Sequence, residues 1–307
     1  DTNGIPDMAI GRLPALSNDE LQSLVDRIVV YDTETDAAWH RRFILAADNG
    51  DDGGNFEAAS DALAALAPTN YTLAHAYLTN APLAVTRTNL LAQLNGGAAF
   101  FNYYGHAGLD RLAHEGILLA TDIPALTNTP RVPVCLALTC VIGQFSTPNY
   151  DSLGELLLLA PSGGAMAVWS PSGWSIHDSA QIMAEEFYRG IFQESEVTLG
   201  DAMLTAMNRY AERSRTTVTL KIYNLLGDPA LRVAGAEALA GQPGIDLAPG
   251  AGYAAWSDQA FSFWQLQDSS VSGPDADPDG DGLGNLLEYA LTSNPWQPDN
   301  APLALDA

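Results

Sequence analysis

A histidine and a cysteine follow the ends of two apolar segments, and these residue types suit covalent catalysis. Residues 98–104 are followed by Gly105 and His106, and residues 132–138 lead to Cys140. Both segments have the length and composition of buried strands. Parallel neighbouring strands lie about 4.8 Å apart and end at one edge of the sheet, where open α/β sheets hold their reactive groups. The pattern therefore predicts a cysteine–histidine nucleophilic site at that edge.

The chemistry of this pair places demands on the neighbouring residues. The imidazole takes the thiol proton and later delivers it to the leaving amine. The oxyanion of the acyl intermediate needs backbone N–H donors, and glycine lets the backbone approach closely. Gly105 precedes His106, and Gly143 follows Cys140. These neighbours favour a catalytic site, but the pattern alone leaves open a core thiol and a turn histidine.

The chain has two cysteines, Cys135 and Cys140, and both fall in or just after one predicted strand. An extended backbone would separate them by roughly 16 Å, whereas a disulfide needs Cα atoms within about 7 Å. We therefore expect two free thiols. Catalysis accounts for Cys140, and burial as a small apolar residue accounts for Cys135.

The overall charge excludes several classes of partner. The 307 residues carry a net charge of −24, with 37 acidic and 13 basic side chains. Such a field repels phosphate backbones and anionic lipid surfaces, so we expect no nucleic-acid partner. No run of residues approaches the ~18 apolar residues of a membrane span. Because the chain starts at Asp1 without a methionine or signal peptide, we expect a processed or trimmed piece.

Strand-like and helix-like segments alternate as far as Val233. Helices are expected at 18–31, 56–66, 86–94, 152–160, 178–192 and 199–213, and strands at 42–47, 71–78, 98–104, 132–138, 165–169 and 217–225. This alternation predicts right-handed βαβ units and a mostly parallel sheet covered by helices on both faces. Residues 235–252 are rich in glycine, alanine and proline and indicate a linker.

A second motif lies beyond that linker, where residues 277–288 fit the spacing D-x-D-x-D-G-x-x-N-x-x-E. This spacing is typical of an EF-hand calcium loop. The expected ligands are the side chains at five positions and one backbone carbonyl: Asp277, Asp279, Asp281, Asn285 and Glu288, with the carbonyl of Leu283. The alternative is a solvated acidic turn.

The surroundings of the loop argue for a structural calcium site. Residues 269–274 are turn-like, so no helix is predicted before the loop and a paired sensor EF-hand is disfavoured. We expect the aromatic residues before it to form a small core, with a carbohydrate-binding face as the alternative: Tyr253, Trp256, Phe261 and Trp264. An exposed site of this kind suits millimolar extracellular calcium. This predicts a secreted, extracellular or cell-surface protein.

Several motifs, in order along the chain, resemble the gingipain-type cysteine peptidases of the caspase clan. The matching segments include the two strand ends and four further stretches: Asn102-Tyr-Tyr-Gly-His106-Ala-Gly108, Thr139-Cys140-Val-Ile-Gly-Gln-Phe145, Ser152-Leu-Gly-Glu155, residues 6–14, Thr198-Leu-Gly-Asp201 and Leu226-Gly-Asp228-Pro229. The resemblance covers residues 1 to 233. It implies a caspase-like three-layer α/β sandwich and endopeptidase activity without a catalytic cofactor.

The resemblance also implies roles for individual residues. Cys140 would be the nucleophile and His106 the general base and acid, assisted by Asp48 at the end of the first predicted strand. The family has glycine after the histidine; here Ala107 would donate its N–H to the oxyanion. Trp174 would wall the primary specificity pocket, with Trp169 as the alternative.

Two more acids lie in the loop after the first predicted strand. Asp51 and Asp52 occupy the loop where basic-specific relatives carry a pocket acid. Calcium binding or simple solvation is the favoured interpretation for both.

The C-terminal motif resembles dockerin-like and thrombospondin-type-3-like calcium repeats. The predicted organisation is a peptidase domain at 1–234, a linker at 235–252, a calcium module at 253–298 and a tail at 299–307. We expect a secreted cysteine endopeptidase acting on proteins or peptides, either monomeric or part of a larger multidomain chain. The alternative is a catalytically inactive relative that serves as a calcium-stabilised interaction or adhesion module.

Overall fold

The computed structural model describes residues 5–33, 38–193, 198–214 and 217–233, and in the C-terminal part 257, 260–261, 265–280, 282–286, 289 and 294–296. The chain divides into two compact units, Asp1–Ala240 and Gly241–Ala307. The boundary falls within residues 235–252, the predicted linker, which lies outside the described residues.

The first unit is built on a seven-stranded sheet with the order β1-β10-β9-β8-β4-β2-β3. Its strands are β1 (Gly11–Arg12), β2 (Arg42–Ala47), β3 (Thr72–Tyr77), β4 (Phe100–Tyr104), β8 (Val134–Leu138), β9 (Ala167–Pro171) and β10 (Tyr223–Leu226). Neighbouring strands are parallel throughout, except that β10 runs antiparallel to β9. The predicted mostly parallel sheet is therefore confirmed.

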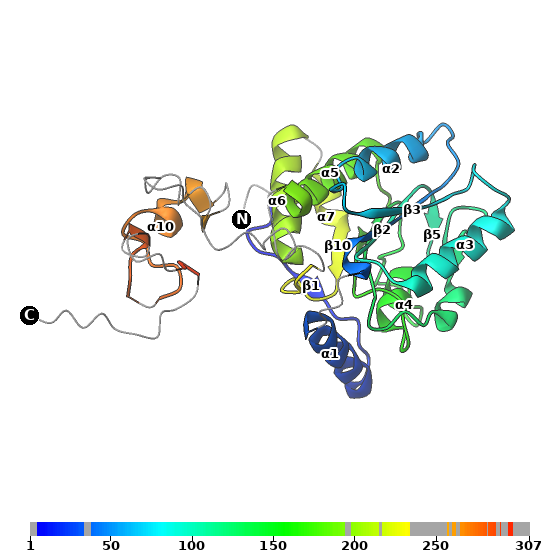
Figure 1. Cartoon of the computed structure of the whole chain (residues 1–307), viewed down its shortest axis with the longest axis horizontal. Helices are drawn as coiled ribbons and strands as arrows, with labels where there is room; N and C mark the ends of the chain where they lie inside the picture. Colours follow the sequence, from blue (N-terminus) through cyan, green and yellow to red (C-terminus); the bar gives the residue numbers. More distant parts are fainter. Residues whose placement is uncertain are drawn as a thin grey trace, which may run out of the picture. The chain divides into compact units, whose positions relative to one another are not determined.

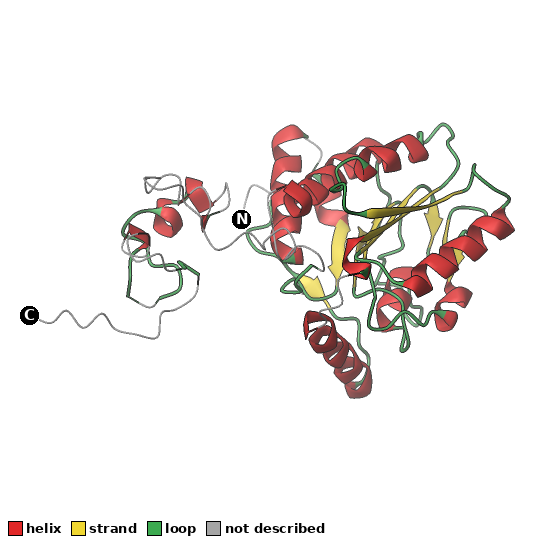
Figure 2. Cartoon of the chain, viewed as in Figure 1, coloured by secondary structure: helices red, strands yellow, loops and turns green. Residues whose placement is uncertain are grey.

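Helices cover both faces of this sheet (Figures 1 and 2). One layer contains α2 (Phe56–Ala64), α5 (His177–Gln193), α6 (Leu199–Arg213) and α7 (Val218–Ile222), and the other contains α1 (Asn18–Thr33), α3 (Leu83–Gly96) and α4 (Leu153–Leu159). Short 3₁₀ helices lie at η1 (Trp39–Arg41) and η2 (Ala120–Ala125). Each layer encloses its own apolar core, so the central strands are buried on both sides.

The central strands form because their sequences are almost wholly apolar, the exceptions being Arg42 at the start of β2 and Asn102 within β4. Residues 43–47 of β2 are fully buried, and β4 and β8 are buried along their whole length. A strand covered on both faces needs no polar alternation, which explains why these segments were recognisable in the sequence. At the start of α4, Ser152 and Glu155 form a reciprocal capping box that fixes where the helix begins.

Part of the strand expected at 217–225 is wrong. Val218–Ile222 forms the short helix α7, and only Tyr223–Leu226 pairs with β9. The helical turn buries Thr219 and Leu220 against the sheet, which outweighs the extended preference of β-branched residues. A small sheet that the sequence pattern did not predict joins β5 (Ala107–Gly108), β6 (Arg111–Leu112) and β7 (Leu118–Leu119).

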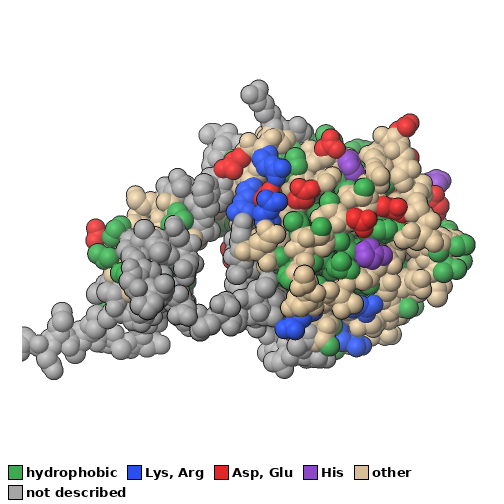
Figure 3. All heavy atoms as spheres, turned by 45° about the horizontal axis from the view of Figure 1, so that its top comes forward, with side chains coloured by type: hydrophobic (Ala, Val, Ile, Leu, Met, Phe, Trp, Pro, Cys, Tyr) green, Lys and Arg blue, Asp and Glu red, His purple; other side chains and the backbone are tan. Residues whose placement is uncertain are grey.

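Acidic and basic side chains are distributed differently over the face shown in Figure 3. Acidic side chains are spread over this face, whereas basic side chains gather in a few places. One such group surrounds the buried Glu186, whose carboxylate lies 3.7 Å from Arg189 and 3.4 Å from Arg209 and also contacts Arg213. None of the described helices is long and apolar enough to cross a lipid bilayer.

The described part of the second unit contains the 3₁₀ helix η3 (Gln265–Gln267) and the helix α10 (Ser269–Ser272). The turn expected at 269–274 is thus partly helical, because the Asp268 side chain accepts the N–H of Ser270 and caps α10. Phe261 is buried and its ring lies 5.5 Å from that of Trp296. The predicted core residues Tyr253, Trp256 and Trp264 lie outside the described residues.

Candidate active site

The sheet register brings the predicted histidine and cysteine to the same edge. Tyr104 at the end of β4 pairs with Leu138 at the end of β8, and the two strands are parallel neighbours. His106 and Cys140 each lie two residues beyond this pair. The N–H of Gly105 donates to the Leu138 carbonyl at 3.3 Å, which keeps the two strands together just before the reactive residues.

The turn that carries Cys140 is tight and strained. Val141 has φ 51°, a left-handed conformation that is rare for a β-branched residue. The N–H of Ile142 donates to the Cys140 carbonyl at 2.7 Å and closes the turn. Strained backbone of this kind clusters at functional sites, where surrounding structure enforces it.

Gly143 permits the close approach that its residue type suggests. A Cβ atom here would lie 2.4 Å from Oγ of Ser170. Its N–H donates to the Pro171 carbonyl at 3.1 Å, and the Gly105 N–H is likewise used within the sheet. Both glycines therefore shape the site through their small size, and neither offers a vacant N–H for an oxyanion.

The two thiols lie in very different surroundings. Cys135 is fully buried, and burial raises the pKa of its thiol to about 12. Cys140 is partly exposed, and its Sγ accepts a hydrogen bond from the N–H of Ser175 at 3.4 Å. Both cysteines are free, as expected, and Cys140 alone presents its sulfur at the sheet edge.

The carboxylate in contact with the imidazole is that of Asp51, whereas Asp48, the acid expected to assist the histidine, contacts its backbone. Nε2 of His106 lies 2.9 Å from Oδ2 of Asp51. The N–H of Gly53 and the imidazole together hold the pKa of Asp51 below its usual range. Asp48 instead accepts the backbone N–H groups of His106, at 3.1 Å, and Asn49, at 2.8 Å. Asp51 replaces it at the ring because the loop after β2 folds back over the edge.

Asp48 supports the backbone of His106 from a buried position. Its side chain is only 2% exposed, and burial raises the pKa of this carboxyl despite its two N–H donors. Gly105 has φ 148°, and a Cβ atom there would lie 2.2 Å from Cβ of Asp48. The hydroxyl of Tyr103 donates to the His106 carbonyl at 2.6 Å. The histidine backbone is thus fixed from three sides.

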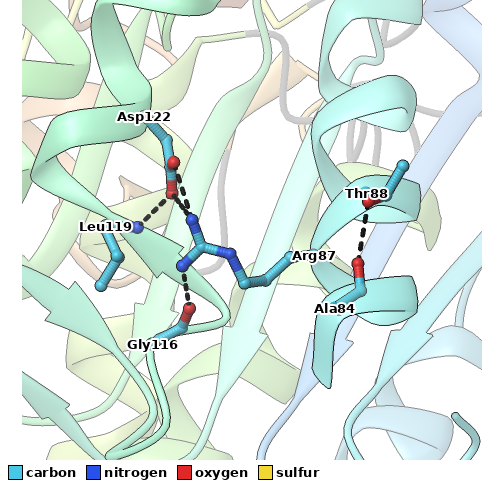
Figure 4. Close-up of polar contacts among 6 residues, drawn as sticks. All are labelled: Ala84, Arg87, Thr88, Gly116, Leu119 and Asp122. Atoms are coloured by element: carbon cyan, nitrogen blue, oxygen red, sulfur yellow. Dashed lines mark hydrogen bonds and ion pairs between the residues drawn. The ribbon is translucent and has the colours of Figure 1, made fainter. Parts of the chain in front are cut away.

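The hairpin that follows His106 is fastened to α3 by one arginine (Figure 4). Arg87 reaches from α3 to the carbonyl of Gly116, at 2.6 Å, and to both carboxylate oxygens of Asp122, at 2.8 and 3.0 Å. Asp122 also accepts the N–H of Leu119 at 2.8 Å. This half-buried pair stabilises the small sheet β5–β6–β7, in which Ala107 is the first residue.

The two candidate pocket tryptophans have opposite environments. Trp169 is 1% exposed and packs in the core against Phe187, so it cannot wall a substrate pocket. Trp174 is 82% exposed and lies next to Ser175, whose N–H contacts Cys140. Of the two, only Trp174 is accessible beside the nucleophile.

Two residues near the edge were missed or misjudged from the sequence, namely Asp51 and His177. Asp51 was assigned to solvation or calcium, and its contact with His106 depends on how a loop folds back. His177 has no glycine neighbours, yet its ring stacks on Tyr104 at a centroid distance of 4.9 Å. No local sequence signal marks either contact, since both join segments far apart in the chain.

The acidic motif of the second unit is described only in part. Asp277 accepts the N–H groups of Gly280, at 2.9 Å, and Gly282, at 2.8 Å. Asn285 is fully buried. Asp279 and Leu283 are described, while Asp281 and Glu288 lie outside the described residues. Within the described residues, no three histidine, cysteine or acidic side chains gather around one point that could hold a metal.

The side chain of Asn285 is fixed by hydrogen bonds from its amide nitrogen. Its Nδ2 donates to the carbonyls of Val271 and Gly273, both at 2.8 Å. Its buried amide oxygen makes no hydrogen bond to the described part of the chain. An amide oxygen left in this way is suited to a cation.

Comparisons with known proteins agree with the fold. Lys-gingipain of Porphyromonas gingivalis is 28% identical over 171 residues, which are 54% of this chain and 10% of that protein. The crystal structure of the Arg-specific cysteine proteinase gingipain R superposes with a TM-score of 0.66 at 22% identity, covering 75% of this chain and 56% of that one. A complex of the pro- and mature domains of Porphyromonas gingivalis RgpB gives a TM-score of 0.65 at 22% identity, with 76% and 58% covered.

These matches cover only part of each related protein. The chain spans about a tenth of the length of the curated relatives it matches and somewhat more than half of the solved chains. At this identity the solved structures establish the α/β fold with helices on both faces of the sheet. The sequence model of Peptidase family C25 matches residues 1–234. The chain belongs to peptidase family C25.

Proposed function

We propose that this chain is a cysteine endopeptidase whose nucleophile is Cys140. The observation that carries the proposal is the register of β4 and β8, in which Tyr104 pairs with Leu138 and His106 and Cys140 each follow two residues later. Membership of peptidase family C25 supports the same chemistry. No cofactor enters the reaction, because a thiolate and an imidazole suffice for acyl transfer.

The contacts of His106 suggest how the proton moves. With Nε2–H donating to Asp51, Nδ1 is the basic nitrogen and takes the proton of the Cys140 thiol. The thiolate attacks the peptide carbonyl carbon, and the tetrahedral oxyanion accepts the N–H of Ala107. When the C–N bond breaks, the imidazolium gives its proton to the leaving amine. Water activated by His106 then hydrolyses the thioester and releases the thiol.

The substrate-facing side of the site is apolar. Trp174 is 82% exposed and Ile176 is 53% exposed, on either side of the Ser175 N–H that contacts Cys140. We infer that these two side chains pack against a peptide held beside the nucleophile. Proteins and peptides are therefore the substrate class, and Trp174 is the pocket wall.

The decisive experiment compares the parent chain with Cys140→Ala and Cys135→Ala on a digested proteome. The parent and Cys135→Ala should cleave, while Cys140→Ala should lose more than about 1000-fold in rate. Iodoacetamide should react with Cys140 near neutral pH faster than with free cysteine, and His106→Ala should slow that reaction. Cleavage retained in Cys140→Ala overturns the proposal. A slow thiol that is insensitive to His106 would favour the inactive interaction or adhesion module.

We also propose that residues 277–288 bind one structural Ca²⁺. The supporting observation is Asn285, whose buried amide oxygen has no hydrogen-bond partner among the described residues although its nitrogen has two. Oxygen donors at this spacing fit a hard cation. Through Asn285, the cation would link the loop to the Val271 and Gly273 carbonyls at the end of α10. The ligands would be Asp277, Asp279, Asp281, Asn285 and Glu288 with the carbonyl of Leu283.

Calorimetric titration tests this site directly. The intact chain should take up one Ca²⁺, and Asp277→Ala should take up none. Uptake that is absent in the parent, or unchanged in the variant, would overturn the assignment. Since a site this open suits millimolar calcium, we infer a secreted or cell-surface protein in which the calcium segment stiffens the chain.

A further inference from the structure

A second imidazole lies beside the catalytic edge. His177 begins α5, and its ring stacks on that of Tyr104 with centroids 4.9 Å apart and planes inclined by 12°. The hydroxyl of Tyr104 donates to the His177 carbonyl at 2.8 Å. The ring of Phe56 meets His177 edge-on at 5.6 Å and meets His106 edge-on at 5.2 Å. One phenyl ring therefore contacts both imidazoles.

The turn that carries Asp51 lies against the same two imidazoles. A Cβ atom on Gly53 would lie 3.2 Å from the His106 ring, and one on Gly54 would lie 2.7 Å from the His177 ring. Gly54 also has φ 147°, a conformation that side chains rarely adopt. Because Gly53 and Gly54 have no side chains, their backbone can lie directly against the rings of His106 and His177. The ring of His177 thus supports the turn at Gly54.

The closure of this turn transmits the position of Gly54 to Asp51. The backbones of Asp51 and Gly54 exchange two hydrogen bonds of 3.1 Å. The N–H of Gly53 donates to Oδ1 of Asp51 at 2.7 Å, and Oδ2 contacts Nε2 of His106. Any displacement of Gly54 would therefore move the carboxylate that orients the imidazole.

We propose that His177 is a positioning residue that holds the Asp51 turn in place and thereby sets the Asp51–His106 contact. The inference rests on the proposed peptidase function. Nδ1 of His177 is buried and has no hydrogen-bond partner in the described part of the chain, so the ring acts through its faces and edge. Its role is to present an aromatic surface and not to transfer a proton.

The test compares His177→Phe, which keeps a flat aromatic ring, with His177→Ala, which removes it. On a peptide substrate, His177→Ala should lower kcat about 10-fold with KM nearly unchanged, because the orientation of the base is lost. His177→Phe should retain kcat to within about 3-fold. Equal losses in the two variants, or a change confined to KM, would overturn the proposal.

A double-mutant cycle with Asp51→Ala identifies the route of the effect. If His177 acts through Asp51, His177→Ala should add less than about 2-fold to the loss already caused by Asp51→Ala. Fully multiplicative losses would show that His177 acts independently and would overturn the proposal. Melting temperatures of all four proteins reveal whether any variant is merely unfolded.

A spectroscopic readout separates this inference from the peptidase proposal. In protein with ¹⁵N-labelled histidine, the Nε2–H signal of His106 should be lost in Asp51→Ala and His177→Ala and kept in His177→Phe. This pattern would support the positioning role even if the parent cleaved no peptide, in which case only the peptidase proposal would fail. A signal that is unchanged in His177→Ala, with Asp51→Ala losing it, would overturn the positioning role.

Discussion

The sheet edge that carries His106 and Cys140 and the acidic segment 277–285 both contain turns in which an aspartate accepts backbone N–H groups, but close packing is seen at the edge. At the edge, a Cβ atom on Gly105 would lie 2.2 Å from Asp48, and one on Gly54 would lie 2.7 Å from His177. In the acidic segment, no described atom lies within 4 Å of the same position on Gly280 or Gly282. The edge is fixed by neighbouring atoms, whereas in the described part of the acidic segment Gly280 and Gly282 have open space around them.

This difference indicates that the two regions would reach a defined geometry in different ways. The edge is preorganised, since aromatic rings and strand ends determine where Asp48 and Asp51 lie before any substrate arrives. The acidic segment carries several carboxylates close together in the sequence, and in our proposal a bound cation would offset their mutual repulsion. Mutations should therefore disrupt the edge through steric overlap and the acidic segment through loss of ligands.

The largest effect is expected for Gly105→Ala. The new methyl group would overlap Asp48 and the hydroxyl of Tyr103, and φ 148° is unfavourable for alanine. We expect a loss of roughly 3 kcal/mol in the free energy of unfolding and a fall in kcat/KM of more than about 100-fold. Chemical denaturation and peptide hydrolysis measure the two effects.

Two alanine variants provide matched controls. Gly108→Ala places its Cβ no closer than 3.5 Å to its neighbours, so activity and stability should stay near the parent values. Gly280→Ala has open space but a φ of 76°, and should cost only about 1 kcal/mol. If Gly280→Ala destabilised the protein as much as Gly105→Ala, the contrast between packed and open turns would be wrong.

Next in size is Asp51→Ala. Removing the carboxylate that contacts Nε2 of His106 should lower kcat/KM by about 10- to 100-fold, because the imidazole loses its orientation and its charge partner. Asp52→Ala makes the same change of charge on the neighbouring exposed residue and should lower kcat/KM by less than about 2-fold. Initial rates at several substrate concentrations give both values.

The same assay decides between the two candidate acids. Asp48→Ala should act mainly on stability, since that carboxylate accepts backbone N–H groups and does not contact the imidazole. A folded Asp48→Ala that lost more activity than Asp51→Ala would return the catalytic role to Asp48.

The contrast between these acids shows what the sequence could predict. β2 was predicted at its observed bounds because the five apolar residues that follow Arg42 are best buried as a strand in such a fold. His106 and Cys140 were predicted to meet at one edge because each follows a largely apolar run, and the register of β4 and β8 brings both to that edge. Asp51 was not assigned to the histidine because its position depends on a turn closed by Gly54 and supported by a distant helix. Propensity carries no information about such contacts.

Similar reasoning explains the other errors. Trp169 and Trp174 have the same side chain, and only the bounds of β9 show that the first points into the core. The expected strand at 217–225 contains β-branched residues, but burial of Leu220 favours the helix α7. His177 is functional in our proposal through a stack on Tyr104, a contact between segments that are distant in sequence.

A smaller effect is expected on removing calcium. EDTA should lower the melting temperature of the calcium segment, because binding stabilises by about 1.4 kcal/mol when free calcium is ten times Kd. Asp279→Ala should abolish this response. Asp275→Ala, an exposed acid just before the motif, should keep it. Differential scanning calorimetry with and without EDTA measures the shift, and a shift that persists in Asp279→Ala would place the cation elsewhere.

The smallest effect concerns the pH dependence of Asp48. Burial raises the pKa of this carboxyl in the native state above the value of about 3.9 expected for the unfolded chain. The native state therefore binds the proton more tightly, so stability is greatest below pH 4 and falls as the pH rises through the native pKa. Asp48→Asn removes this titration. Relative to the parent, its free energy of unfolding should increase as the pH rises through the native pKa of Asp48.

Urea denaturation of the parent, Asp48→Asn and Asp52→Asn at several pH values measures this difference. Asp52 is exposed, so its variant should follow the pH dependence of the parent. A difference that moved the opposite way for Asp48→Asn would mean that the N–H groups of His106 and Asn49 stabilise the carboxylate more than burial disfavours it. Asp48 would then resemble Asp277 in the acidic segment, an anion held mainly by its donors, and packing would no longer separate the two regions.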